Sequence, residues 1–347
     1  ATLHWIHTAL HVEVFKHGDK WRQTQTELES KSRRIFNTIE RIMIQLGFVT
    51  AIMPEQNLES VADTAAKIGY DCIEVMCWPK GKADRRYAGI THIDIEGLNK
   101  HKADDIAGKL NDKGVSISAL GYYPNLLSKD KQHARPALAH LKKLIKSAPK
   151  LGVSIVNTFI GAEPSLSDEA NFKSFRKTWP SIIKLAEDHG VQIGIENCPM
   201  YFTQDEWPSG KNLAHSPAMW RRMFEVIPSK NFGLNYDPSH MVWQHMDYLK
   251  PIREFADRFV HVHAKDVRLD QDQLDDVGIM ATPLSYHSPK LPGLGEVNWG
   301  KFLSELGDAG YRGAVCVEVE DRTYEGSRKA RRAALCQSYR YLKNFLP

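Results

Sequence analysis

Short apolar runs alternate with amphipathic stretches along most of the chain. Several runs are continuously apolar and rich in β-branched residues, as strands buried on both faces are. The eight strand candidates lie at residues 46–53, 72–78, 115–123, 153–161, 191–197, 232–237, 259–266 and 314–320. Between them, helical patterns stop at glycines such as Gly69, Gly114 and Gly152. One pattern contains Pro180, where we expect a kink or two short helices.

Regular alternation of strand and helix predicts a parallel sheet with crossover connections. Eight repeats over roughly 300 residues fit a (β/α)8 TIM barrel better than an open doubly wound sheet. The repeat begins near Leu46, so we predict a barrel domain at 46–347 and an N-terminal extension, helical in pattern, at 1–45. In this extension His4, His7 and His11 share a helical face, which we interpret as an exposed polar arm and not as a metal site.

Composition excludes several classes of protein. The 46 basic and 42 acidic residues leave a net charge of +4, which is too balanced to indicate nucleic acid. The five cysteines are odd in number and form no CxxC pair, which favours free thiols in a reducing compartment. No long apolar run and no signal-peptide pattern occur. We therefore expect a soluble, cytoplasmic protein with no membrane partner.

Polar residues stand at the ends of four consecutive predicted strands: Glu196, Asp237, His263 and Glu318. In a barrel these strand ends converge on one mouth. Three carboxylates there would raise each other's pKa unless a cation lay among them. Three oxygen donors and one imidazole suit a single divalent ion, with Mn²⁺ expected first and Mg²⁺, Co²⁺ or Zn²⁺ as alternatives.

Each residue also has a purely structural interpretation. A glutamate at a strand end is often a salt-bridge partner. His261 points the same way as His263 under strand alternation, so one of the two could be a core histidine. Glu318 and Glu320 carry the same ambiguity. The four positions together favour a metal site.

Five motifs give the chain a resemblance to a known family: "IEN" (195–197), "DPSH" (237–240), "HVHAKD" (261–266), "PGLGEVNWGKF" (292–302) and "VEVED" (317–321). Over residues 46–347 the sequence resembles the sugar phosphate isomerase/epimerase superfamily of xylose isomerase-like TIM barrels. The resemblance implies that Asp237 and His263 bind the metal, that Glu196 and Glu318 bind it and act as acid and base, and that His240 faces the substrate. It places His261 behind the ligands.

The resemblance implies a metal-dependent sugar isomerase or epimerase. In such enzymes a metal-stabilised enediolate forms when a proton next to a carbonyl is removed, and a second group returns a proton. The alternative is a lyase or dehydratase that acts on 3-oxo-sugars or 3-oxo-glycosides, including cleavage of C-glycosides. Both share the first step, so the motifs do not separate them.

Further residues are candidates for substrate contacts. Trp78 and Tyr122 could stack on a sugar face, or simply pack, and Asn125 could bind a hydroxyl. Lys265 and Arg268 could meet a phosphate or carboxylate, or solvent. Residues 268–293 are too long for an ordinary loop, and we interpret them as a substrate lid from which His287 and Lys290 reach inward. We interpret Cys198 as a bystander.

Other classes of partner fit less well. We expect a small sugar or an oxidised sugar derivative, and leave open a homo-oligomer or a small partner subunit. A barrel nuclease of the apurinic-site type would need extra histidines on strands two and three, where Trp78, Tyr122 and Tyr123 stand instead. A non-catalytic sugar-binding relative would be expected to have lost one of the four metal ligands, and all four are present.

Overall fold

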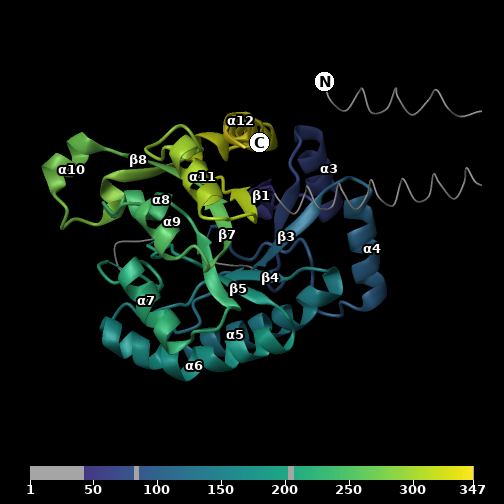
Figure 1. The fold of residues 1–347 in the computed structure, drawn as a ribbon, viewed down its shortest axis with the longest axis horizontal. Coiled ribbons are helices and arrows are strands. Elements are labelled where there is room, and N and C mark those ends of the chain that lie inside the picture. Colours follow the sequence, from purple (N-terminus) through teal and green to yellow (C-terminus); the bar gives the residue numbers. More distant parts are fainter. Residues whose placement is uncertain (1–42, 82–85, 202–206, 347) are drawn as a thin grey trace, which may run out of the picture. The chain divides into compact units, whose positions relative to one another are not determined.

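The computed structural model describes residues 43–81, 86–201 and 207–346. Within them eight parallel strands close into a barrel in the order β1-β10-β7-β6-β5-β4-β3-β2 (Figure 1). The strands are β1 (Gln45–Val49), β2 (Cys72–Met76), β3 (Ser116–Gly121), β4 (Ile155–Thr158), β5 (Gln192–Glu196), β6 (Phe232–Tyr236), β7 (Phe259–Ala264) and β10 (Ala314–Val317). The prediction of a (β/α)8 barrel is confirmed.

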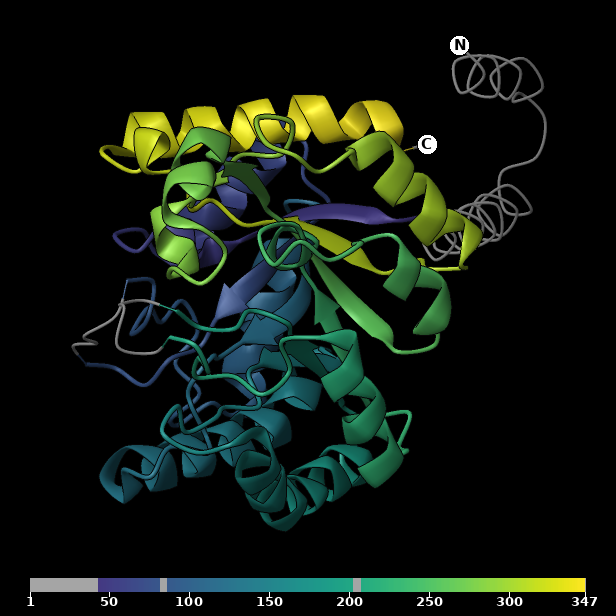
Figure 2. The same cartoon turned by 90° about the vertical axis from the view of Figure 1, so that its left-hand side faces the viewer.

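Helices connect the strands and lie around the outside of the barrel (Figure 2). Their bounds are α3 (Leu58–Ile68), α4 (Lys100–Asn111), α5 (Lys131–Ser147), α6 (Asp168–Asp188), α7 (Pro217–Val226), α8 (Ser239–Val242), α9 (Lys250–Glu254), α10 (Gln271–Val277), α11 (Trp299–Asp308) and α12 (Arg328–Leu342). The predicted stop at Gly69 caps α3 in the left-handed conformation at φ 109°, which glycine adopts without strain. No helix in this described part is long and apolar enough to cross a bilayer.

Helix α6 runs without interruption through Pro180, so the alternative of two short helices is wrong. Proline has no N–H group, so the carbonyl of Arg176, four residues earlier, receives no helical hydrogen bond. Arg176 and Pro180 are both exposed to solvent. On the other side of the helix, Phe175, Trp179 and Ile183 are buried on either side of the proline. Packing of this apolar face therefore holds the helix together where the hydrogen-bond ladder is broken.

The predicted lid is a folded hairpin. Strand β7 ends at Ala264, short of the predicted Asp266, and β8 (Asp266–Leu269) pairs antiparallel with β9 (His287–Lys290). Helix α10 and a short 3-10 turn, Pro283–Ser285, lie between these two strands. We call residues 266–290 the mouth hairpin, because it follows the C-terminal end of β7.

Asp266 explains why the chain turns there. Its carboxylate accepts hydrogen bonds from the N–H groups of Val267 (2.8 Å), Gly293 (2.9 Å) and Val297 (3.0 Å), and from the indole of Trp299 (2.9 Å). A Cβ at Gly295 would come within 2.4 Å of Asp266 Oδ1 and of the Val267 carbonyl, so only glycine fits there. The "KD" and "PGLGEVNW" motifs are thus two halves of one anchor for the mouth hairpin.

The N-terminal region lies mostly outside the described residues, including His4, His7 and His11. The compact unit that contains the barrel spans Ile44–Pro347, and β1 starts at Gln45, one residue before the predicted start. The division of the chain at residue 45 stays a prediction.

Replacing the anchor carboxylate should destabilise the protein strongly. Asp266→Ala leaves four donors without their acceptor, and each unsatisfied buried donor costs about 1–3 kcal/mol. We expect the free energy of unfolding, measured by urea denaturation, to fall by about 3 kcal/mol or more. The control is Asp270→Ala, which removes the exposed N-cap of α10 and should cost about 1 kcal/mol. An equal or smaller loss in Asp266→Ala would contradict this role.

Candidate metal centre

The four predicted ligands come together at the mouth of the barrel. Glu196 ends β5, Asp237 follows β6, His263 lies on β7 and Glu318 follows β10. One donor atom from each lies within 4.8 Å of the donor atoms of the other three. Glu196, Asp237 and His263 are buried, and Glu318 is half-buried. Residues separated by more than a hundred positions in sequence therefore form one compact cluster, which we call the mouth cluster.

Two asparagines hold the backbone that carries these ligands. The Asn197 amide accepts from the N–H of Asp237 (2.8 Å) and donates to its carbonyl (2.9 Å), which ties the end of β5 to the end of β6. The Asn212 amide donates to the carbonyl of Glu196 at 2.9 Å. Asp237 Oδ1 accepts from the N–H of Ser239 at 2.8 Å, which turns Oδ2 toward the cluster. Hydrogen bonds within the protein thus fix the positions of these candidate ligands.

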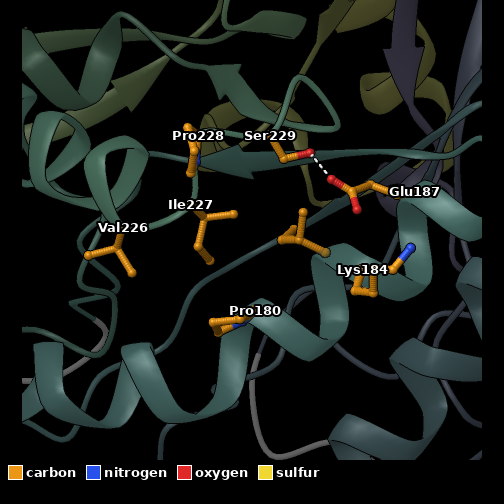
Figure 3. Close-up of a pocket in the computed structure, with 8 residues that line it drawn as sticks. Pro180, Lys184, Glu187, Val226, Ile227, Pro228 and Ser229 are labelled. Atoms are coloured by element: carbon orange, nitrogen blue, oxygen red, sulfur yellow. Dashed lines mark hydrogen bonds between the residues drawn. The ribbon is translucent and has the colours of Figure 1, made fainter.

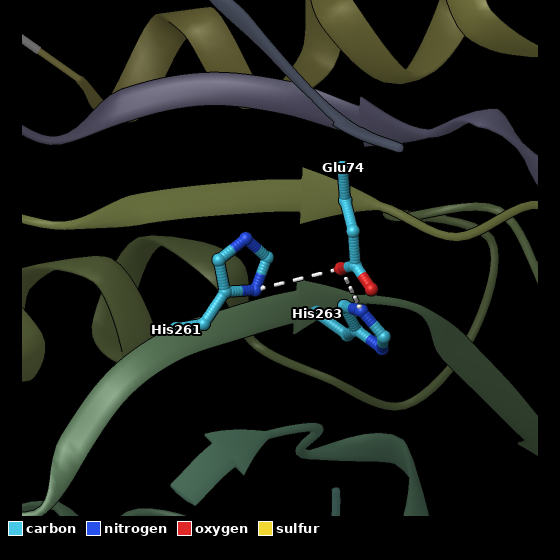
Figure 4. A group of neighbouring side chains, drawn as sticks. All are labelled: Glu74, His261 and His263. Carbon is cyan, nitrogen blue, oxygen red and sulfur yellow. Dashed lines mark hydrogen bonds and ion pairs between the residues drawn. The ribbon is translucent and has the colours of Figure 1, made fainter. Parts of the chain in front are cut away.

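His263 is oriented by Glu74, a residue of β2 that the motifs did not point to (Figure 4). Nε2 of His263 lies 2.7 Å from Glu74 Oε2, so the Nε2–H group donates to this carboxylate. Burial lowers the pKa of His263, but without a bound ion Glu74 and Glu196 raise it above its usual value. In the neutral ring that a metal ion would bind, the lone pair is on Nδ1, which lies 3.6 Å from Glu196 Oε1 and 3.8 Å from Glu318 Oε2. A carboxylate behind a histidine in this way fixes the tautomer that a metal ion requires.

Glu74 stays ionised in this environment. Burial raises the pKa of its carboxyl, but His263 and His261 together lower it below its usual value. The hydroxyl of Tyr123 also donates to Glu74. His261 lies beside this pair: its Nδ1 is 3.0 Å from Asn235 Oδ1 and its Nε2 is 3.1 Å from Ser118 Oγ. Both ring nitrogens of His261 have protein partners, which agrees with a position behind the ligands.

The donor atoms that face the cluster fit a metal ion. Nδ1 of His263 and Oδ2 of Asp237 are buried and make no hydrogen bond of normal geometry within the described residues. Buried polar atoms without hydrogen bonds are costly and uncommon. Asp237 Oδ2 is paired with the Lys265 ammonium at 3.2 Å, and its convergence with the unbonded His263 Nδ1 favours a further cation. Carboxylate oxygens with one imidazole nitrogen match the donor preference of divalent ions. A divalent ion would also reduce the electrostatic repulsion among the three carboxylates of the cluster.

Lys265 supplies part of the positive charge in the cluster. Its ammonium nitrogen lies 2.7 Å from Glu318 Oε2, 3.1 Å from Glu320 Oε2 and 3.2 Å from Asp237 Oδ2. The side chain is buried, so these charges interact with little screening by water. From the sequence, Lys265 is a candidate contact for a phosphate or carboxylate of the substrate, or for solvent. In the structure its partners are carboxylates of the protein itself.

The two glutamates differ in their electrostatic environment. Burial raises the pKa of Glu318, and Glu320 and Glu196 raise it further against the opposing effect of Lys265, to about 7. Burial also raises the pKa of Glu196, but His263, His240 and Lys265 more than offset this and lower it. Carboxyls whose pKa values are pushed apart can serve as a proton donor and a proton acceptor. A cation bound at the cluster lowers both.

His240 lies at the edge of the cluster on α8. Its Nε2 is 3.4 Å from Asp237 Oδ2 and 3.5 Å from Glu196 Oε1. Burial lowers the pKa of His240, but the neighbouring Cys198 and Asp237 raise it to about 10 while no cation balances the carboxylates. A divalent ion among these carboxylates opposes that rise. The sulfur of Cys198, which the sequence suggests is a bystander, lies within 4.8 Å of a donor atom of Glu196 and of His240.

The other predicted substrate residues lie at varying distances from the mouth cluster. Tyr122 is buried and packs edge-on against Trp78 (4.9 Å between ring centroids) and His140 (4.7 Å). The amide of Asn125 is engaged by backbone, because it donates to Ala162 and accepts from Leu127. Arg268 is exposed on β8. These contacts describe packing and loop structure, and the roles of these residues toward a substrate stay predictions.

His287 and Lys290 both lie on β9 of the mouth hairpin. The His287 ring stacks on Trp243 at 5.0 Å with an interplanar angle of 9°. Lys290 Nζ lies 3.5 Å from Asp321 Oδ1, next to the segment that follows β10. Through these two side chains the hairpin contacts Trp243 and the segment after β10. It is a structured element and not a loop, and its role as a substrate lid stays a prediction.

A surface groove elsewhere on the barrel is not part of this site (Figure 3). Pro180, Lys184 and Glu187 of α6 line one side, and residues 226–229, which lead into β6, line the other. These segments precede strands, whereas the mouth cluster follows strand ends. Ser229 also donates to Glu187 across the groove at 2.6 Å. The groove and the mouth cluster therefore belong to different ends of the barrel.

Glu74 and Glu320 lie beside the mouth cluster, against His263 and Lys265. The sequence motifs do not point to Glu74, and they leave Glu320 as an alternative to Glu318. A signal for Glu74 exists: in "CIEVM" it is the single charged residue of a strand that is otherwise apolar and buried on both faces. Charged residues are almost never fully buried unless they are paired. A carboxylate in such a strand therefore predicts a partner inside the barrel, which here is His263.

Neutralising Glu74 should weaken metal binding without removing a ligand. In Glu74→Gln the amide no longer favours a proton on His263 Nε2, and such supporting groups typically contribute about 10–100-fold to metal affinity. We expect the dissociation constant, measured by competition with a chelator, to rise by about this factor. Glu187→Gln, on the surface of α6, is the matched control and should bind as the wild type does. Unchanged affinity in Glu74→Gln would show that the pair with His263 does not support a metal ligand.

Comparison with known proteins places this architecture in a family. The family model described as "Xylose isomerase-like TIM barrel" matches residues 62–344. An inosose dehydratase of Geobacillus thermodenitrificans is 23% identical over 222 residues, covering 51% of this chain and 73% of the relative. Among solved structures, the IOLI protein with a bound zinc atom has a TM-score of 0.64 at 20% identity, covering 87% of this chain and 99% of its own. D-psicose 3-epimerase from Clostridium cellulolyticum H10, determined with D-tagatose, has a TM-score of 0.61 at 15% identity, with coverages of 87% and 99%. The chain is a member of the xylose isomerase-like TIM barrel family.

Proposed function

We propose that the protein is a divalent-metal-dependent enzyme that removes and returns a proton next to the carbonyl of a sugar, as an isomerase or epimerase. The observation that carries the proposal is the position of Glu196 and Glu318 around His263 Nδ1, at 3.6 and 3.8 Å. The two glutamates reach the cluster from β5 and β10, on either side of β6 and β7 in the barrel order. A substrate held at the cluster would therefore have a carboxylate on two sides.

We assign the metal to Glu196, Asp237, His263 and Glu318. A divalent ion bound there supplies Lewis acidity that makes a C–H group next to a coordinated carbonyl more acidic. We keep Mn²⁺ as the expected ion. The zinc atom bound to the IOLI protein supports a divalent metal in this fold but does not select manganese here.

The proton transfers are assigned to the two glutamates. Glu196, whose pKa is lowered by His263, His240 and Lys265, is the stronger candidate for the ionised base. Glu318, whose Oε2 lies 3.8 Å from His263 Nδ1, is the candidate for the group that gives a proton back. For an epimerase working in the reverse direction these roles exchange. Either way the chemistry needs both carboxyl groups near one carbon.

Three neighbouring groups would bind and orient the substrate. His240 presents Nε2 toward Glu196 and Asp237, where a sugar oxygen would lie. Lys265 places a buried positive charge between Glu318 and Glu320, which stabilises negative charge on a nearby oxygen. Trp78 is partly buried and follows Cys77, which forms an isolated β-bridge with Thr91. We assign its ring as an apolar surface for a sugar.

A dehydratase or lyase is the second candidate, and one observation favours it. The curated relatives that match this chain include inosose dehydratases, one of them 30% identical over 132 residues. Such an enzyme would use the same base, and the ammonium of Lys265 would donate a proton to the departing oxygen. The substrate would then carry a carbonyl and, on the carbon beyond the acidic C–H, a hydroxyl or glycosyl group.

Replacing Glu318 should separate chemistry from metal binding. Glu318→Gln keeps an oxygen ligand but removes the proton-transfer group, so turnover should fall by about 10²–10⁴-fold. The metal content should fall far less. We would measure both with a panel of ketoses and 3-oxo-glycosides, following deuterium in D₂O by NMR. The wild type should place deuterium next to the carbonyl, and Glu318→Gln should not.

The control is Glu163→Gln, a glutamate that contacts Lys129 and Ser165 outside the cluster. It should keep wild-type turnover and exchange. Loss of water or of a glycosyl group from the substrate, with deuterium exchange, would select the dehydratase or lyase. Conversion without any exchange, with the label of a deuterated substrate carried intact to the neighbouring carbon, would show hydride transfer and exclude both candidates.

A further inference from the structure

Trp243 follows the one-turn helix α8 that carries His240, and its indole N–H points at His240 Nδ1. The distance is 3.2 Å, and both side chains are buried. An indole nitrogen can only donate a hydrogen bond. His240 Nδ1 must therefore accept, so the neutral ring carries its proton on Nε2.

The Nε2 atom is the one that faces the mouth cluster. It lies 3.4 Å from Asp237 Oδ2 and 3.5 Å from Glu196 Oε1, and it makes no hydrogen bond of normal geometry to any residue that the structure describes. With its proton on Nε2, His240 presents a donor to this space. The atom of a substrate that approaches it is then an acceptor oxygen.

The mouth hairpin holds Trp243 in this orientation. His287 of β9 stacks on the indole at 5.0 Å with an angle of 9°, and Tyr201 packs edge-on against it at 5.9 Å. The Nδ1 of His287 is bonded to the Pro283 carbonyl, and burial lowers the pKa of this ring to about 4, so it stays neutral. A neutral ring can stack on the indole without bringing a charge beside His240.

The tautomer of His240 also decides whether a second set of donor atoms can bind a metal ion. Glu196, Cys198 and His240 each offer one donor within 4.8 Å of the others, which would suit a thiophilic ion such as Zn²⁺ or Co²⁺. A metal ion on Nε2 requires the proton to move to Nδ1. There it would face the indole N–H of Trp243, and two donors would oppose each other.

We propose that Trp243 is a positioning residue that keeps the proton of His240 on Nε2, so that His240 donates to a substrate oxygen and does not bind a metal with Glu196 and Cys198. The donation to substrate rests on the proposed function. The tautomer and the choice against a thiolate-bound metal do not, since they follow from contacts within the protein. Because His287 of the mouth hairpin stacks on the Trp243 indole, the hairpin contributes to positioning His240.

The tautomer can be read directly by NMR. Protein loaded with one equivalent of zinc, a diamagnetic ion, would carry ring-¹⁵N histidine, and His240→Gln would assign the resonances. In the wild type we expect an unprotonated Nδ1 and a protonated Nε2. Trp243→Phe keeps an aromatic ring on His287 but removes the N–H, so the proton should populate Nδ1. Trp220→Phe removes an indole N–H that donates to the Ala214 carbonyl at 2.7 Å and should leave His240 unchanged.

A wild-type spectrum with a proton on Nδ1, in the other tautomer or in the charged ring, overturns the proposal whether or not the variants fold. An unchanged His240 in folded Trp243→Phe also overturns it. Because the readout is the position of a proton, it is independent of any substrate. Failure of the proposed sugar chemistry would therefore leave this result intact, and the reverse holds as well.

Cobalt titration tests the metal half of the proposal. A Co²⁺ ion bound to a thiolate shows a charge-transfer absorption band that oxygen and imidazole ligands do not produce. The wild type should show no such band through two equivalents of Co²⁺. Trp243→Phe should gain it with the second equivalent, and Trp243→Phe combined with Cys198→Ser should not. A thiolate band in the wild type, or none in Trp243→Phe, would contradict the role of Trp243.

Discussion

The need to balance several buried carboxylates shapes the mouth of this barrel. Glu196, Asp237 and Glu318 lie close together where water is scarce, and isolated buried charges are unfavourable unless paired. The protein meets part of this need with the ammonium of Lys265, which touches two of these three carboxylates and Glu320. Among the described residues, His263 Nδ1 has no hydrogen-bond partner, and Asp237 Oδ2 has the ion pair with Lys265 but no hydrogen bond of normal geometry. A divalent cation would complete the balance that Lys265 begins.

The surrounding structure keeps each donor aimed at this point. Glu74 orients His263 from the far side of the barrel, and Asn197 ties Asp237 to the end of the neighbouring strand. Asp266 anchors the mouth hairpin, which in turn presents His287 to Trp243. Glu74, Asn197 and Asp266 are buried and hydrogen-bonded, so the site is organised by the folded chain instead of by a ligand. Such preorganisation is what electrostatic catalysis requires.

The strands and the convergence of the four candidate ligands were predictable because they depend on local pattern and on one rule of topology. Buried parallel strands leave apolar runs, and the polar residues that end them must meet at one mouth. Glu74 was not found, because it lies inside a strand and its partner His263 is 189 positions away in sequence. The sequence predicts a lid loop where the mouth hairpin lies, because β8 and β9 are each four residues long and show no alternation of apolar and polar residues. Contacts between side chains far apart in sequence, such as that of Trp243 with His287, produce no repeating pattern in the sequence from which they could be predicted.

The assignment of one divalent ion to Glu196, Asp237, His263 and Glu318 can be tested by anomalous diffraction at the zinc edge, on crystals of protein loaded with one equivalent of zinc. We expect a single anomalous peak about 2.0–2.1 Å from His263 Nδ1, with carboxylate oxygens of the other three residues around it. A peak bonded to His263 Nε2 beside Glu74, or to His240 and Cys198 without His263, would contradict the assignment.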